Sequence, residues 1–186
     1  KEFVDNRGIR IVTLLHLSDD RYGGVALLKD IKKLGNPLES LRQFFKKNKS
    51  ADGISLNTRG LSKQGEWLAK KLIERKVWID LAHSSDLSQQ ALIPILKAAG
   101  QPILFTHGPI RGFQKYERGA SDYLLSEIRA TGGVLGLAPC EDMVDRTEVQ
   151  NQFCPIGCSA KECSGGVHAL ATQYNYAAKI IGPESI

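Results

Sequence analysis

His16, His83 and His107 share one position in three separate parts of the chain: each is the last residue of a short apolar segment rich in β-branched or aromatic residues. Neutral imidazole is the commonest protein ligand for transition metals, and rigid elements can hold several imidazoles around one zinc ion. The competing interpretation is that each imidazole only bonds a backbone carbonyl. The shared position favours metal or substrate contact, and the chemistry it indicates is a metal-activated water.

The elements that would position these histidines follow a regular order. The apolar segments predict strands, and the intervening segments have helical spacing with Ser at the start or Gly at the end. Strands that alternate with helices run parallel and bring their carboxyl ends to one face, where α/β enzymes place their chemistry. We therefore expect an α/β fold, part of a (β/α)8 TIM-type barrel or a small open sheet, with about four strand-helix units. The expected strands are residues 9–16, 76–83, 103–107 and 134–138, and the expected helices are residues 62–75, 86–99, 122–130 and 167–181.

Two parts of the pattern are less regular. Residues 18–57 form a long polar connection, in which residues 25–34 and 38–49 have helical spacing and residues 48–60 read as loop. Pro94 lies inside the helix predicted for residues 86–99, so that helix is either kinked or begins later than its first signal. The fourth histidine, His168, falls in a helical pattern and is expected at the surface or in the core.

Length and composition indicate one ordinary globular domain over residues 1–186, with 42% hydrophobic and 24% charged residues. No apolar run approaches the roughly 18 to 20 residues that span a bilayer, and no signal-peptide pattern opens the sequence. The net charge of +5 comes from scattered lysines without a basic, aromatic-bearing stripe. Nucleic acid is therefore not expected as a partner.

All four cysteines fall in one stretch, and their spacing is not the tight pairing of the commonest zinc ribbons. Clustered cysteines of even number favour disulfides and hence an oxidising compartment, secreted or periplasmic. Free thiols and a small metal site are the alternatives, and the connectivity stays open. The cysteines are Cys140, Cys154, Cys158 and Cys163.

Several of these segments resemble the membrane (renal) dipeptidase family of zinc peptidases. The residues that carry the resemblance are Trp-Ile-Asp-Leu-Ala-His-Ser-Ser at 78–85, Pro-Ile-Leu-Phe-Thr-His at 102–107, Gly-Ile-Arg-Ile-Val-Thr-Leu-Leu-His at 8–16 and Gly-Leu-Ser-Lys-Gln-Gly at 60–65. Arg118, followed by Gly-Ala-Ser-Asp, stands where the family has Arg-Asn-Val-x-Asp. The order of the segments along the chain matches as well.

The resemblance implies a (β/α)8 barrel in which two zinc ions activate a hydroxide that cleaves a dipeptide amide bond. It implies that His83 and His107 are zinc ligands. It implies that His16 is a catalytic residue that contacts the substrate and steadies the tetrahedral intermediate, and that Arg118 binds the substrate carboxylate. A histidine donor suits a developing oxyanion, and a guanidinium fork suits a carboxylate.

The sequence also departs from the family pattern. The family's His-x-Asp, its bridging glutamate and its last-strand aspartate have no place in this chain, and Gly119 stands where the pattern has Asn. Two histidines alone rarely hold a catalytic zinc ion, which takes three protein ligands and a water. We therefore expect a single dipeptidase-like domain that is incomplete at both ends and supplies part of the site, with zinc occupancy left open.

Three functions remain open from the sequence. The first is the zinc-dependent dipeptidase-like hydrolase, acting on a dipeptide or another small carboxylate-bearing substrate. The second is a non-catalytic barrel segment that binds a peptide or a partner chain, since unpaired strand edges favour pairing with another copy or a complementing chain. The third is another metal-dependent amidohydrolase, which would not need Arg118 to face a free carboxylate.

Overall fold

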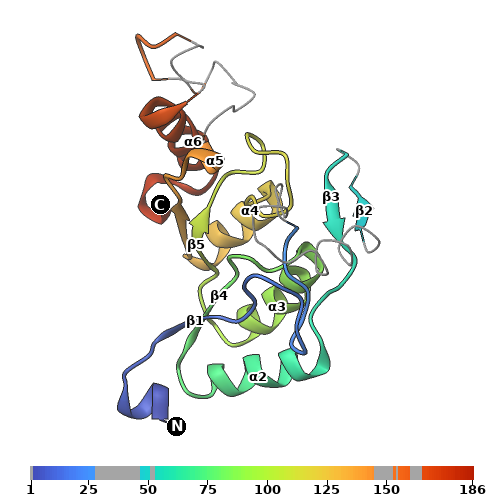
Figure 1. The fold of residues 1–186 in the computed structure, drawn as a ribbon. Helices are drawn as coiled ribbons and strands as arrows, with labels where there is room; N and C mark the ends of the chain where they lie inside the picture. The colour runs from blue at the N-terminus through green and yellow to red at the C-terminus, as the bar shows by residue number, and fades with distance from the viewer. Residues whose placement is uncertain (1, 28–46, 51–52, 145–152, 154, 160–164) are drawn as a thin grey trace. The chain divides into compact units, whose positions relative to one another are not determined.

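The computed structural model describes residues 2–27, 47–50, 53–144, 153, 155–159 and 165–186 (Figure 1). The chain forms two compact units. The first contains Lys1–Leu104 and Tyr116–Arg118, and the second contains Phe105–Lys115 and Gly119–Ile186. The strands follow the hydrogen-bonded order β1-β4-β5-β6, and β1 with β4 and β4 with β5 pair in parallel. This confirms the α/β class that the alternating pattern predicts.

In the first unit, β1 (Ile11–Thr13) pairs with β4 (Trp78–Asp80), and Asp80 pairs with Leu104, the first residue of β5 (Leu104–Gly108). The side chain of Ile79, in the middle of β4, is fully buried. Strands β1 and β4 are both shorter than predicted. β1 ends before His16 and β4 ends before His83, because the chain leaves the sheet in a loop after the first strand and a tight turn after the second.

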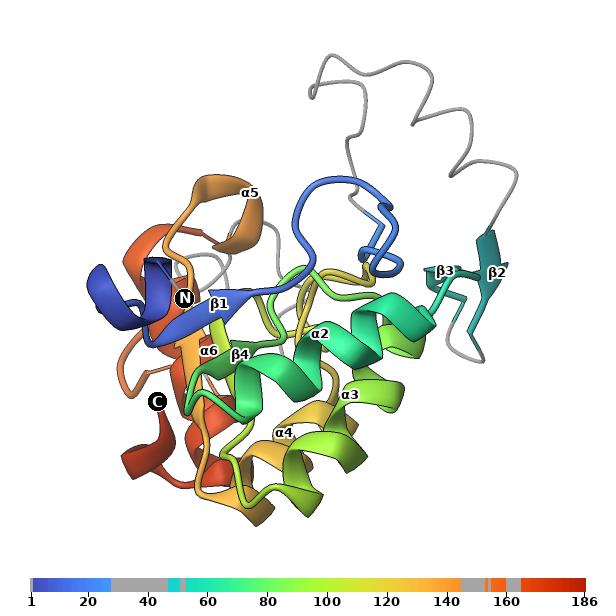
Figure 2. The same cartoon turned by 90° about the horizontal axis from the view of Figure 1, so that it is seen from below.

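Two capped helices cover the sheet in the first unit. Helix α2 (Lys63–Ile73) begins after Ser62, whose side chain accepts the Gly65 amide at 3.0 Å. Helix α3 (Asp86–Ala98) begins after Ser85 and contains Pro94, so it starts at its first signal and continues through the proline. Figure 2 shows α2 and α3 side by side, and they are in contact. Their buried side chains include Ala69, Leu92, Ile93 and Leu96.

Two regions of the first unit differ from the sequence-based expectation. Strands β2 (Lys47–Lys49) and β3 (Ser55–Asn57) pair antiparallel, where the sequence predicted the end of a helix and a loop. Val25 forms an extended bridge to Ser84 and does not begin a helix. Ala26 and Leu27 are not helical either, and residues 28–34 and 38–46 of the two predicted helices lie outside the described residues.

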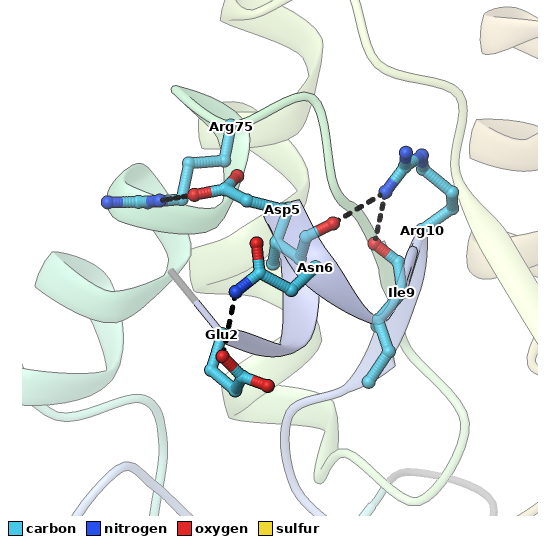
Figure 3. A network of polar contacts seen from close by, with 7 residues as sticks. Glu2, Asp5, Asn6, Ile9, Arg10 and Arg75 are labelled. Atoms are coloured by element: carbon cyan, nitrogen blue, oxygen red, sulfur yellow. Dashed lines mark hydrogen bonds and ion pairs between the residues drawn. The ribbon is translucent and has the colours of Figure 1, made fainter.

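The start of the chain is held by polar contacts at the surface (Figure 3). The short helix η1 (Glu2–Asn6) approaches the end of α2, where Arg75 lies 3.3 Å from the carboxylate of Asp5. Arg10 donates to the carbonyls of Val4 and Ile9, each at 3.0 Å. These groups are exposed, and such contacts contribute little to the free energy of unfolding.

The second unit contains the remainder of β5, strand β6 and the last helices. Strand β6 covers Val134–Leu137, and helix α4 (Asp122–Thr131) begins after Ser121 and ends at Gly132, which is left-handed with φ 62°, as the sequence predicted. Helix α6 (Gly166–Ile181) packs on α4 through a 2.8 Å hydrogen bond from Tyr176 to Asp122. Shorter helices are α5 (Glu141–Val144) and η5 (Pro183–Ser185). Within the described part of the chain, no helix is both long and apolar enough to cross a membrane.

Candidate active site

His83 lies in a tight turn directly after β4. The amide of Ser84 donates to the carbonyl of Leu81 at 3.1 Å, which closes the turn, and His83 has a φ of 70°. A non-glycine residue with positive φ is uncommon and persists only where its surroundings fix it, and such residues cluster at functional sites. The His83 side chain is largely buried, at 9% exposed. The turn therefore holds one imidazole in a defined place at the carboxyl end of a strand.

A neighbouring segment fixes the backbone of this turn. The amide of Ala26 donates to the His83 carbonyl at 2.7 Å, and Val25 bridges to Ser84. One residue further on, the Ser85 amide donates to the Gly24 carbonyl at 3.1 Å. These contacts on both sides of His83 account for the stability of its unusual backbone conformation.

His16 reaches the same place from the loop after β1. Its ring centroid lies 4.2 Å from that of His83, and the two ring planes are inclined by 42°. His16 is exposed whereas His83 is largely buried. The structure thus brings together two of the residues that the sequence singled out, and one of them faces solvent.

A partly buried polar contact joins the last residues of β1 and β4. The Thr13 hydroxyl donates to Asp80 Oδ2 at 2.7 Å, and Asp80 Oδ1 accepts the Ala82 amide at 3.0 Å. Asp80 is fully buried. It therefore ties the last residue of each strand to the start of the turn that carries His83.

Arg118 belongs to the same unit and is almost fully buried, at 1% exposed. Burial lowers the pKa of Arg118 to about 10, and the nearby Tyr116 and Asp80 act in the opposite direction. The guanidinium therefore remains positively charged at neutral pH. A buried cation of this kind can pair with a carboxylate group far more strongly than an exposed one can.

Glu117 is a buried charged residue that sequence reasoning did not single out. It is fully buried, and its carboxylate accepts three backbone amides: Leu27 at 2.7 Å, Asn57 at 2.9 Å and Asp86 at 3.0 Å. Burial raises its pKa to about 7, the three amide contacts lower it, and the charge of Asp86 raises it further. Its neighbour Arg118 was the only signal in the sequence, because the three partners are backbone groups.

His107 lies in the second unit, within β5 and one residue before its end. Its Nδ1 is 2.9 Å from the hydroxyl of Thr106, and its side chain is partly exposed. The fourth histidine, His168, is in α6 and lies 3.2 Å from the sulfur of Cys158. Cys140 is exposed, and Cys154 and Cys163 lie outside the described residues, so the disulfide prediction stays a prediction.

Imidazoles are suitable zinc ligands, but the residues that the structure describes contain no group of three or more His, Cys, Asp or Glu side chains that could hold a metal ion. A catalytic zinc ion takes three protein ligands and a water. The described residues therefore do not complete a metal centre by themselves.

The fold and the site define an α/β protein with parallel strands whose carboxyl ends carry imidazoles. The model of the family described as "Membrane dipeptidase (Peptidase family M19)" matches residues 4–186. The chain belongs to this family. A dipeptidase of Clonostachys rogersoniana, verJ, is 31% identical over 75 residues, which is 40% of this chain and 19% of that protein.

Solved structures share the fold. The probable dipeptidase PvdM from Pseudomonas aeruginosa matches with a TM-score of 0.60 and 17% identity, over 97% of this chain and 51% of that one. A metallopeptidase from Rhodobacter sphaeroides, liganded with a phosphinate mimic of L-Ala-D-Ala, matches with a TM-score of 0.51 and 16% identity, over 66% of this chain and 31% of that one. The chain thus spans about half or less of the length of these relatives. Their fold confirms the prediction of part of a barrel.

Proposed function

We propose that this chain forms part of the active site of a zinc-dependent dipeptidase. The observation that carries the proposal is the approach of His16 and His83, which follow two neighbouring parallel strands and whose ring centroids lie 4.2 Å apart. Family membership supports the reaction class, since the relatives named above are dipeptidases and metallopeptidases.

In this proposal, His83 and His107 are zinc ligands, and the remaining ligands come from residues other than the described ones. A zinc ion bound there would lower the pKa of a bound water, so that a hydroxide is available near neutral pH to attack an amide carbonyl. His83 suits the role because its turn fixes the ring, and a ligand held by its own backbone loses little freedom on binding. The partly exposed imidazole of His107 lies one residue before the end of β5, in the second unit.

His16 and Arg118 have roles toward the substrate. His16 is exposed beside His83, so its N–H can donate to the oxyanion that develops when the carbonyl is attacked. Arg118 is cationic at neutral pH and would pair with the free carboxylate of a dipeptide, which orients the scissile bond. Dipeptides, or other small molecules with a carboxylate at one end, are therefore the proposed substrates.

The experiment is a measurement of zinc by elemental analysis, combined with an assay of dipeptide hydrolysis on the intact protein. Asn at position 83 keeps a residue that tolerates positive φ, so H83N together with H107A removes both imidazoles with little backbone strain. H168A is the matched control, because His168 contacts Cys158 and not the proposed site. Zinc lost in the double variant and retained in H168A supports the proposal. Zinc that stays bound after both imidazoles are removed overturns the ligand assignment.

A second candidate function is peptide binding without catalysis. The observation that favours it is that the described residues assemble no group of three metal ligands. The two functions differ in metal content and turnover. A protein that contains no zinc and binds dipeptides without cleaving them belongs to the second class, and the Arg118 contact to a carboxylate would then serve binding alone.

A further inference from the structure

We propose that Glu117 is a positioning residue of this site, whose buried carboxylate holds the His83 turn and Arg118 in place by binding three backbone segments at once. The inference rests on the proposed function for its catalytic consequence. The contacts themselves do not depend on it. Glu117 touches neither substrate nor metal in this scheme and acts through its neighbours.

The three segments that meet at Glu117 are distant in the sequence. One oxygen, Oε2, accepts the amides of Leu27 and Asn57 at 2.7 and 2.9 Å, and the other, Oε1, accepts the amide of Asp86 at 3.0 Å. A carboxylate is the side chain that offers several acceptor sites and no donor, so it satisfies three amides without conflict. The residue is fully buried, and unmade bonds to these amides would leave buried donors unsatisfied.

Two of these segments flank the turn that carries His83. Leu27 follows Ala26, whose amide donates to the His83 carbonyl at 2.7 Å. Asp86 is the first residue of α3 and follows the turn by two residues. Glu117 therefore holds the chain immediately after the Ala26 contact to His83 and the chain immediately after the turn. Loss of the carboxylate removes support from both sides of a backbone with φ 70°.

Glu117 is also linked covalently to Arg118, which is the next residue in the chain. Anchoring of Glu117 by three amides fixes the backbone from which the Arg118 side chain extends. The negative charge at the start of a 13-residue helix is also favourable, because it faces the partial positive charge of the α3 N-terminus. Asp86 is a charged group that acts on the carboxylate, and Asp19 accepts a hydrogen bond from the Asn57 side chain at 2.8 Å.

The test compares E117Q and E117D with E66Q, a control in which an exposed glutamate of α2 loses its charge. Gln turns one acceptor oxygen into an NH2 donor that faces backbone donors, and Asp is one methylene too short to reach all three amides. Amide hydrogen exchange, followed by NMR at Leu27, Asn57 and Asp86, should speed up about tenfold or more in both variants. The amide of Leu125, bonded within α4 to Ser121, should not change.

Each outcome decides the proposal. Local acceleration at the three amides, with a change in the ring contact between His16 and His83, supports it. Unchanged exchange, or equal acceleration at Leu125, overturns it, because the second result indicates general loss of stability. If the variants do not fold, the wild-type protein is titrated. The three amide protons must then shift with one common midpoint, and separate midpoints or no shift overturn the proposal.

Kinetics separate this inference from the proposed function. With dipeptide as substrate, E117Q should lower kcat about 10- to 100-fold at unchanged zinc content, and E117D should recover part of the loss. A kcat that equals wild type despite faster local exchange overturns the positioning role. If the wild-type protein hydrolyses no dipeptide, the proposed function fails, and the exchange data alone decide whether Glu117 holds the turn.

Discussion

The imidazole rings of His16 and His83 lie 4.2 Å apart, although one extends from the loop after β1 and the other from the turn after β4. The two strands are parallel neighbours, with Thr13 in register with Asp80. Their carboxyl ends therefore deliver both rings to one place. The rings differ in exposure, and this difference suits a division of roles in which the buried ring binds a metal and the exposed ring meets the substrate.

Replacement of His16 by Ala should lower kcat for dipeptide hydrolysis about 10²- to 10³-fold, which is the usual effect of losing one donor to an oxyanion. Zinc content should be unchanged, because His16 is not a ligand in the proposed mechanism. The checks are steady-state kinetics and elemental analysis of the same sample. H168A, which alters the histidine of α6 beside Cys158, should retain wild-type kcat. Loss of zinc in H16A would contradict the division of roles.

The approach of His16 and His83 could be predicted from the sequence, because each ends an apolar segment and alternation with capped helices indicates that the carboxyl ends of such segments lie at one face. The lengths of the strands could not be predicted. His83 lies three residues beyond β4, in a turn whose left-handed residue is a histidine and not the glycine or asparagine that usually signals such a turn. The turn is stabilised by residues 24–26, and such long-range contacts leave no local trace in the sequence.

The contact between Thr13 and Asp80 should contribute measurably to stability. T13V keeps the shape of the side chain and removes the 2.7 Å donor to a buried carboxylate, which should lower the free energy of unfolding by about 1.5–3 kcal/mol. Urea denaturation followed by circular dichroism measures this. S126A is the matched control, because the Ser126 hydroxyl donates to Tyr123 at an exposed site, and its effect should stay within about 0.5 kcal/mol. Equal effects of the two variants would show that the hydrogen bond between Thr13 and Asp80 contributes no more to stability than an exposed hydrogen bond does.

Glu117 should make stability depend on pH. Burial raises its pKa from 4.5 to about 7, so between these values the folded protein binds the proton more tightly than the unfolded chain does. The contribution of Glu117 is therefore fully present below pH 4.5 and is lost as the pH rises through about 7, by about 3 kcal/mol in all. The check is urea denaturation from pH 4.5 to 7.5.

E117Q has no proton to exchange in this range, so its stability should fall less steeply than that of wild type as the pH rises. E66Q is the control. The pKa of Glu66 is lowered by its hydrogen bond and charge interaction with Lys70, so this group titrates below the window. Parallel curves for wild type and E117Q would refute the assignment of the slope to Glu117.

Glu117 shows why part of the site escaped prediction. Its three partners are the amides of Leu27, Asn57 and Asp86, and a backbone amide is present at every residue except proline, so no residue type identifies it. Arg118 could be found because its side chain has a chemical role in a motif. A residue whose carboxylate binds backbone amides from several segments can be identified only from a structure in which those segments lie close together.

Gly24 provides a test of the segment that supports the His83 turn. A Cβ atom there would lie 2.0 Å from the Arg59 carbonyl oxygen, which is a backbone atom and cannot rotate away. The Gly24 carbonyl also accepts the Ser85 amide at 3.1 Å and the Ser88 hydroxyl at 2.9 Å. G24A should therefore force the segment away from the turn and lower the free energy of unfolding by about 1–3 kcal/mol.

The matched control is G112A, because among the described residues a Cβ at Gly112 meets only the Tyr176 ring and hydroxyl, at 3.7 Å or more. Its effect on urea denaturation should be near zero or slightly stabilising, since alanine restricts the unfolded chain more than glycine does. G24A should in addition lower zinc content or kcat, because the Ala26 contact to His83 moves with the segment. A G24A protein that is destabilised but keeps wild-type zinc and kcat would show that the turn holds His83 without help from residues 24–26.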